Sequence, residues 1–575
     1  MPFRRGLVHS LEFWAITAIT LLAAFLRFDT LGDKSLHGDE MNMVRFITGE
    51  RDIRLNFGNA HFYIQILRVT HWFGDSDFVM RVPAALAGVV AVPVLYYVGK
   101  QLLDARVGLT AALFLALSPI HIDLSQMVHC YSLFFLFALL SFYYLYRAHT
   151  ESSSRHWMAY ALVTGLCMNT HLFTVFMIGA QVLILMILWG HGWWQRRRSD
   201  GEDGANAPSL PRPWLHVAGV TAVILLFSMQ VILGTIAPML GEVSKKVSGE
   251  GTEVNQLESG RQFVWSVATF AKIPRAMVRW ESLETRSVPI AYLLFAIGTV
   301  WLLRRRWILG VMTLVWVFAP PIPIAIFTEL TTIDFGARRF IFLWPVCLLA
   351  IAVGMSKVTD ALLRFVPLGR QRTVDWRRPV LQSVLPLVLA GLFSMTVVKD
   401  YFLFYERPDF KFAADLIDRR ANPQDFILTF KPEQLYYYLP KDRKAHTVNT
   451  MSLETIRTLF RKGQGIWYLR YNSLRHRPHY EEIEKWLTEI GATTIQVGGG
   501  MALSFHRHPA ALPKAPFRAK QELYRERVEV LSAAIILKPN RWYLHHALGG
   551  VYDAWDRRAS AREREYKRSR ELRQR

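Results

Sequence analysis

Two adjacent carboxylates, Asp39 and Glu40, lie a few residues beyond the first long apolar segment of the chain, in the stretch SLHGDEMN (35–42). Gly38 allows the backbone to turn sharply beside them. The later stretch AHFYIQILRVTHWFG (60–74) has the pattern of an amphipathic helix in a membrane interface. A carboxylate held close to a bilayer could act as a general base on a lipid-linked substrate. The alternative is a solvated acidic pair in a loop.

Other polar residues interrupt or border the apolar segments. Asp123, with His121 nearby, ends one segment, and an acid at the edge of the membrane is more often functional than structural. His171 divides a long apolar stretch, either as a helix breaker or as a residue of a site. Arg338 and Arg339 begin a further segment, where they are either anchors that reach the headgroups or contacts to a phosphate.

Side chains that bind divalent metal ions occur near the same positions. His37, His61, His121 and Asp123 have suitable donor atoms, but their spacing matches no metal-binding motif. The sequence therefore leaves metal dependence open.

Membrane helices must position these residues, because the composition is that of a membrane protein. Of the 575 residues, 52% are hydrophobic and 13% are aromatic. Runs long enough to cross a bilayer predict eleven spans, the first of them an uncleaved signal anchor. The spans are expected at residues 11–28, 82–101, 107–123, 130–147, 157–172, 173–190, 214–236, 288–303, 307–328, 339–356 and 380–399.

The basic residues indicate the orientation of the spans. If the N-terminus is cytoplasmic, the inside loops contain runs of Lys and Arg, whereas the short outside segments 120–129 and 329–337 contain none. An odd number of spans then places the C-terminus in the periplasm. We expect a multi-pass protein of a bacterial inner membrane, with residues 1–400 as its membrane domain and a first periplasmic loop at 29–81. The alternation also accounts for much of the net charge of +22 without nucleic acid as a partner.

The chain beyond about residue 400 has a soluble composition. Short β-rich stretches alternate with helical patterns between residues 401 and 508, which predicts a periplasmic α/β domain. The strands are expected at residues 425–430, 445–450, 465–471 and 493–507. Residues 509–575 are expected to be helical, and LSAAIILKPNRWYLHHALGGVYDAW (531–555) is similar to a tetratricopeptide repeat. This segment is either a partner-binding module or a helical hairpin packed on the α/β domain.

The order of the motifs resembles the glycosyltransferase-C (GT-C) superfamily, and within it the branch of protein O-mannosyltransferases and the lipid A aminoarabinose transferase. The motifs are SLHGDE after the first span, Arg81 with Pro83, AALFLALSP (111–119), SQMVHCYSL (125–133), ARRFIFLWP (337–345) and YERPDF (405–410). The resemblance extends over about residues 10–430. It implies a polytopic α-helical membrane protein with the GT-C fold.

The resemblance also implies a donor sugar linked to a polyprenyl phosphate and a carboxylate in the first outer loop that takes the proton of the acceptor. That role maps onto Asp39, with Glu40 as its neighbour in the catalytic pair. The predicted substrate-binding residues are His61, Asp123, His129, Tyr131, His171, Arg338 and Arg339.

The chain departs from the family pattern at two places. Family members often have a His-Pro-Pro-Leu-like block where this chain has His61-Phe62-Tyr63, and many have an arginine where it has His129. A histidine would contact phosphate or sugar more weakly than an arginine, or in a pH-dependent way.

The sequence thus predicts an inverting membrane glycosyltransferase that takes a lipid-phosphate-linked sugar as co-substrate and transfers it to a protein, lipid or glycan. Alternatives are a transporter or lipid flippase, and a non-catalytic scaffold that binds a protein partner through residues 509–575. Transporters place charged residues near the bilayer midplane, often within repeated halves. The notable acids here border the outer surface, and no internal repeat is visible. The sequence specifies neither the sugar nor the acceptor.

Overall fold

The structure, a computed structural model, divides into two compact units. The first comprises Met1–Leu31 and Asn42–Phe404, and the second comprises Gly32–Met41 and Tyr405–Arg575. The acidic pair therefore belongs to the second unit. The structure describes residues 2–50, 60–199, 213–231, 233, 287–324, 337–365, 377–404, 407–429, 432–444, 447–449, 453–461, 465–471, 478–498, 501–506, 516–538, 540–555, 565, 568–569 and 571–573.

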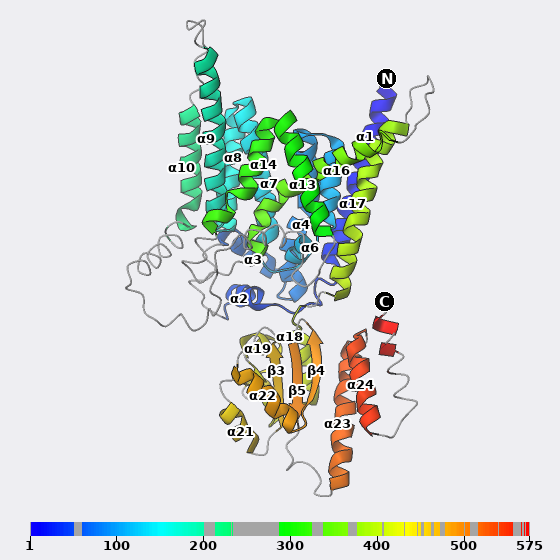
Figure 1. The fold of residues 1–575 in the computed structure, drawn as a ribbon. Helices are drawn as coiled ribbons and strands as arrows, with labels where there is room; N and C mark the ends of the chain where they lie inside the picture. The colour runs from blue at the N-terminus through cyan, green and yellow to red at the C-terminus, as the bar shows by residue number, and fades with distance from the viewer. Residues whose placement is uncertain are drawn as a thin grey trace. The chain divides into compact units, whose positions relative to one another are not determined.

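The first unit is a bundle of α-helices (Figure 1). Its elements are α1 (Pro2–Phe28), α3 (His61–His71), α4 (Asp77–Leu102), α5 (Ala105–Ala116), α6 (Pro119–Ser125), α7 (Tyr131–Glu151), α8 (Ser154–Thr170), α9 (Thr174–Ser199), α10 (Pro213–Val231), α13 (Ser287–Arg305), α14 (Trp307–Phe318), the 3-10 helix η3 (Ala337–Leu343), α16 (Trp344–Leu362) and α17 (Arg377–Phe404). Each of the eleven predicted spans overlaps one of these helices.

The predicted count of eleven spans is not confirmed. Within the described part of the chain, six helices are long and apolar enough to cross a membrane. Helices α5 and α6 together make a seventh, broken by a bend of 62°. A shorter apolar helix covers Val380–Met395. The chain is therefore a multi-pass membrane protein whose number of crossings is left open.

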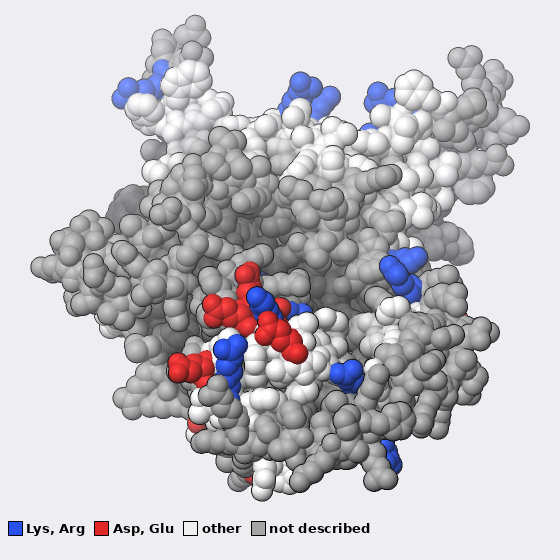
Figure 2. All heavy atoms as spheres, turned by 60° about the horizontal axis from the view of Figure 1, so that its bottom comes forward, with Lys and Arg blue, Asp and Glu red and all other residues white. Residues whose placement is uncertain are grey.

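The basic helix ends gather at one end of the bundle, as the charge alternation predicts. Lys100 at the end of α4 pairs with Glu12 near the start of α1. Arg106 at the start of α5 lies 3.1 Å from Asp360 near the end of α16, and Lys357 lies 3.3 Å from the same carboxylate. Figure 2 shows Lys and Arg side chains along the top edge of that view. Which side of a membrane this end faces stays a prediction.

Small residues let two helices of the bundle approach closely. A Cβ atom on Gly298 of α13 would lie 1.9 Å from the carbonyl oxygen of Ala350 in α16. A Cβ atom on Gly354 of α16 would lie 2.0 Å from the carbonyl oxygen of Leu294. Close backbone contact through small residues is typical of packing between membrane helices, where van der Waals contact replaces the hydrophobic effect.

The break between α5 and α6 is stabilised by a buried cation. Arg27, at the end of α1, is fully buried. Its Nη2 donates to the carbonyl oxygen of Leu115 at 2.9 Å, and its Nη1 donates to that of Ala116 at 3.2 Å. The last carbonyls of a helix lack regular N–H donors, and the guanidinium adds to the bond that the carbonyl of Leu115 accepts from the N–H of Ser118 at 3.2 Å. Nδ1 of His121 accepts from the same guanidinium at 3.0 Å.

The second unit contains a five-stranded sheet with the order β2-β1-β3-β5-β4. The strands are β1 (Phe426–Thr429), β2 (Thr447–Asn449), β3 (Ile466–Tyr471), β4 (Thr493–Gly498) and β5 (Met501–His506). Strand β1 pairs in parallel with β2 and β3, whereas β5 pairs antiparallel with β3 and β4. All five lie within the stretches where strands were predicted.

Helices cover both faces of this sheet. Leu435 of α19 (Pro432–Tyr438) and Leu416 of α18 (Phe410–Arg420) pack with Trp467 and Leu503 on one face. Helices α21 (Leu453–Arg461) and α22 (Pro478–Glu489) pack on the other face, with Tyr468 in their core. A short helix α20 (Lys441–Lys444) precedes β2.

The C-terminal helices α23 (Pro516–Leu537) and α24 (Trp542–Trp555) contact each other and the sheet domain. Leu531 and Ala534 of α23 and Leu544 and Leu548 of α24 belong to the same hydrophobic core as β3 and β5. This arrangement corresponds to the helical hairpin that was one of the two expectations. The tetratricopeptide character of the segment is not confirmed.

Candidate functional site

The acidic pair forms the first turn of helix α2 (Gly38–Ile47). Carboxylates are favoured there because backbone N–H groups point out of the helix. Glu40 is fully buried, and its Oε2 accepts a hydrogen bond from the backbone N–H of His37 at 3.1 Å. This contact is the returning half of a capping box. Asp39 is partly exposed. The two neighbours thus lie in different environments.

Glu40 also pairs with an arginine that is remote in sequence. Nη1 of Arg407 lies 3.4 Å from Oε2 of Glu40, and the two side chains are 5% and 0% exposed. A buried carboxylate requires a partner of this kind, because desolvation penalises an isolated charge. Arg407 lies in the YERPDF motif, to which the sequence analysis gave no role. The motif was the only sequence signal for this residue.

A second group of predicted residues lies in the membrane unit. The imidazole of His129 stacks on the ring of Tyr131, with centroids 4.1 Å apart, and Tyr131 lies 5.6 Å from the ring of His171. The guanidinium of Arg339 lies 5.8 Å from the ring of Phe173, which is an edge contact of His171. We call His129, Tyr131, His171 and Arg339 the histidine–arginine cluster.

Backbone contacts set the tautomers of both histidines in the cluster. Nδ1 of His129 accepts from the N–H of Cys130 at 3.0 Å, and Nδ1 of His171 accepts from the N–H of Phe173 at 3.2 Å. In the neutral form each ring therefore carries its hydrogen on Nε2. Each ring is thus a hydrogen-bond donor at Nε2, as recognition of an anion requires.

The cluster lies at helix ends that favour negative charge. Tyr131 begins α7, and His171 lies in the short link before α9. The amino ends of helices carry partial positive charge and attract phosphates. Arg338 and Arg339 on η3 add two cations. Helix α16 begins directly after η3 and runs to the basic end described above, where Lys357 and Asp360 lie, so the cluster is at the opposite end of the bundle.

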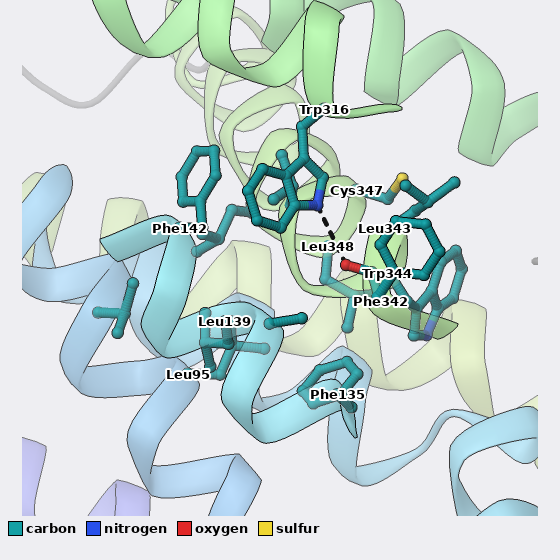
Figure 3. Close-up of a cluster of buried hydrophobic side chains, with 14 of the residues drawn as sticks. Leu95, Phe135, Leu139, Phe142, Trp316, Phe342, Leu343, Trp344, Cys347 and Leu348 are labelled. Carbon is teal, nitrogen blue, oxygen red and sulfur yellow. Dashed lines mark hydrogen bonds between the residues drawn. The ribbon is translucent and has the colours of Figure 1, made fainter. Parts of the chain in front are cut away.

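Packing fixes the 3-10 helix that carries the two arginines. The indole nitrogen of Trp316 in α14 donates to the carbonyl oxygen of Phe342 in η3 at 3.1 Å (Figure 3). The ring of Phe342 in turn lies 5.3 Å from that of Phe134 in α7. Trp316 and Phe342 are fully buried. Because η3 is held in place, the backbone atoms from which the Arg338 and Arg339 side chains extend have defined positions.

The remaining predicted substrate-binding residues lie on other elements. His61 is the first residue of α3 and is partly exposed, and Asp123 is buried in α6. Among the residues that the structure describes, no three His, Cys, Asp or Glu side chains are grouped so that they could hold a metal ion. His37, His61, His121 and Asp123 therefore do not form a metal site within that part of the chain.

Comparison with solved structures identifies the class of fold. The crystal structure of ArnT from Cupriavidus metallidurans in the apo state matches with a TM-score of 0.51 and 13% identity, over 88% of this chain and 100% of that chain. The structure of the same protein bound to undecaprenyl phosphate matches with a TM-score of 0.51 and 13% identity, over 87% and 99%. At this identity the likeness shows the fold, which is that of the GT-C glycosyltransferases.

The match to a sequence family covers a shorter part of the chain than the match to solved structures. Residues 60–201 match the family of dolichyl-phosphate-mannose-protein mannosyltransferases. This range includes α3 to α9 and three members of the histidine–arginine cluster. Comparison of the sequence with curated proteins gives no match. The resemblance to the GT-C superfamily is thus confirmed by the fold and by this family match.

Proposed function

We propose that this chain is an inverting membrane glycosyltransferase that transfers a sugar from a polyprenyl-phosphate donor to a periplasmic protein, lipid or glycan. The observation that carries the proposal is the difference between the two adjacent carboxylates. Glu40 is buried against Arg407, whereas Asp39 beside it is partly exposed on the same helical turn. One carboxylate is held by the fold, and its neighbour is accessible for proton transfer.

In this reaction a hydroxyl or amine of the acceptor attacks the anomeric carbon of the sugar. The bond between that carbon and the phosphate oxygen breaks as the new bond forms on the opposite face, so the configuration is inverted. The polyprenyl phosphate leaves with the electron pair of the broken bond. Asp39 takes the proton of the acceptor as general base. Positive charge is needed where the phosphate becomes a leaving group.

The histidine–arginine cluster supports binding of the donor phosphate. It combines two Nε2–H donors, the Arg339 guanidinium and the amino ends of α7 and α9. Guanidinium groups and helix amino ends are frequent partners of phosphates in proteins. His129 stands where many relatives have an arginine, so Arg338 and Arg339 would supply the permanent charge. ArnT, which shares the fold, was crystallised with undecaprenyl phosphate.

The proposal is tested with the variant Asp39→Asn in the full chain. Mass spectrometry of glycans and lipids from cells that lack the chain would identify the transferred sugar, and plasmid-borne variants would then be compared for transfer. Asp39→Asn should abolish transfer and leave binding of undecaprenyl phosphate unchanged. The matched control is Asp33→Asn, which alters an exposed carboxylate in the same segment. Full transfer by Asp39→Asn would refute the assigned base.

A further inference from the structure

We infer that Arg407 and Asp409 of the YERPDF motif are positioning residues for catalysis, because they fix the segment 32–41 that carries Asp39. The inference rests on the proposed role of Asp39 as general base. If the inference is correct, the C-terminal domain affects the rate of the reaction by positioning Asp39, and none of its residues needs to touch the substrate. The acidic segment and the motif belong to the same compact unit despite their separation in sequence.

The segment is bound to the domain at Ser35 by a reciprocal pair of hydrogen bonds. The Ser35 hydroxyl donates to Oδ1 of Asp409 at 2.8 Å and accepts from the backbone N–H of Lys411 at 2.9 Å. Oδ1 of Asp409 also accepts from the N–H of Phe412 at 3.0 Å, which makes Asp409 the N-cap of α18. The carboxylate that starts α18 therefore also holds the segment, and Ser35 itself is buried.

Two further contacts bring the domain up to the acidic pair. The backbone N–H of Leu36 donates to the hydroxyl of Tyr438 at 2.6 Å, and Leu36 is fully buried. Gly38 lies against Gln434, since a Cβ atom at this position would be 3.0 Å from its Nε2. Helix α19 supplies both partners, Tyr438 and Gln434. Only a residue without a side chain allows this approach without displacing Gln434.

The Arg407–Glu40 pair completes the series of contacts at the residue next to Asp39. The segment is thus held at positions 35, 36, 38 and 40, which leaves little freedom for the residue between the last two. A general base must lie within hydrogen-bond reach of the proton that it takes, and a displacement of about 1 Å can cost about a hundredfold in rate. The contacts at positions 35, 36, 38 and 40 limit such a displacement of Asp39.

The C-terminal hairpin reaches the same network. Nζ of Lys538, just after α23, lies 3.1 Å from Oδ2 of Asp409, while Oδ1 of the same carboxylate accepts from Ser35. Burial raises the pKa of the nearby Tyr543, and the charge of Asp409 raises it further, whereas Arg541 acts in the opposite direction. Asp409 is therefore shared between the hairpin and the acidic segment.

The test compares transfer by full-length Arg407→Gln, Arg407→Lys and Ser35→Ala in detergent. Membranes of cells lacking the chain supply the acceptor, and their polyprenyl-phosphate lipid extract is titrated as donor. We expect kcat of Arg407→Gln to fall about a hundredfold with an unchanged KM for the donor extract. Arg407→Lys should recover part of the loss because the charge is kept. The control Arg470→Gln, which breaks an ion pair with Glu484 on the other face of the sheet, should retain kcat.

Ser35→Ala is a second, milder variant that separates positioning from a folding defect, because Ser35 lies in no strand and in neither hydrophobic cluster of the sheet domain. It should lower kcat about tenfold. Unchanged kcat in both Arg407→Gln and Ser35→Ala, with Asp39→Asn inactive, would overturn the positioning role and leave the proposed function standing. Full activity of Asp39→Asn would instead refute the assigned base, on which the positioning role rests. A loss in Arg407→Gln that appears entirely as a higher donor KM would also overturn the positioning role.

Discussion

The Glu40–Arg407 pair can be measured directly through the exchange of one backbone amide. The N–H of Leu36 is bonded to the Tyr438 hydroxyl, so it exchanges with solvent only when the acidic segment leaves the domain. We consider a double-mutant cycle of Arg407→Met, Glu40→Gln and the combined variant. Exchange of the Leu36 amide reports the free energy of this local opening in each variant.

The expected size of the effect follows from burial and distance. Two charges 3.4 Å apart attract by about 5 kcal/mol at an effective dielectric constant of about 20, from which the desolvation of both groups must be subtracted. Removal of Arg407 alone leaves the Glu40 carboxylate buried, which costs about 3–5 kcal/mol. Exchange of the Leu36 amide should then become more than about a hundredfold faster. The combined variant has no unpaired charge, so the coupling energy of the cycle should be about 2–3 kcal/mol.

The measurement is hydrogen–deuterium exchange of the full chain in detergent, followed by mass spectrometry of peptides that contain Leu36. The amide of Gly465, which donates to Asp425 at 3.1 Å within the same unit, is the internal control and should not change. If Leu36 exchanges equally fast in wild type and Arg407→Met, the pair does not hold the segment. If Leu36 and Gly465 accelerate together, the domain unfolds as a whole and the reasoning about a local anchor is wrong.

Two further changes test the membrane unit. Arg339→Gln should weaken binding of undecaprenyl phosphate by about tenfold to a hundredfold, because a charge-assisted hydrogen bond contributes about 1.5–3 kcal/mol, whereas Arg68→Gln on the exposed face of α3 should not. Gly298→Ala should lower the free energy of unfolding by about 1–3 kcal/mol or more, because the new Cβ would collide with the backbone of α16. The loss would be seen as a lower melting temperature in detergent. Gly179→Ala, with no atom within 4 Å of its Cβ, is the matched control. Equal binding by the two arginine variants, or equal melting of the two glycine variants, would contradict these assignments.

Local patterns were sufficient to predict the long apolar helices and the five strands, but not α2, α18 or η3. A membrane helix needs only a long apolar run, and alternating loop charges indicate which helix ends meet, as Lys100 and Arg106 now show. The strands of the C-terminal domain were predicted for the same reason, because turn residues and β-branched runs are neighbours in sequence. The number of crossings was less predictable, because a bend such as that between α5 and α6 depends on a partner, Arg27, from another helix.

The role of Glu40 could not be predicted from its neighbours in sequence. Asp39 and Glu40 are chemically alike, and only the fold separates them, by bringing Arg407 to one of the two. The same holds for Ser35, whose partner Asp409 is 374 residues away. A short polar stretch in an outer loop has no periodicity that would reveal such contacts. The YERPDF motif was visible in the sequence, but its link to the acidic pair required the structure.

The C-terminal helices cannot be treated as a removable tail. Val530, Leu531, Leu544 and Leu548 are buried in the core of the sheet domain. Burial of such side chains contributes about 1.5–3 kcal/mol each, so about 6–12 kcal/mol together. That sum is comparable to the entire stability of a small domain.

Deletion of residues 516–575 should therefore unfold the sheet domain, release the acidic segment and abolish transfer, even though the helices contain no proposed catalytic group. Limited trypsin digestion of the detergent-solubilised chain would show this as loss of a resistant C-terminal fragment. The matched control is Ile536→Ser, which alters a side chain of α23 that is 74% exposed and should retain both the fragment and transfer. A scaffold that docked a partner on this face would lose its function in Ile536→Ser while the domain remained folded. Retention of a resistant sheet domain after the deletion would show instead that the hairpin is an independent module.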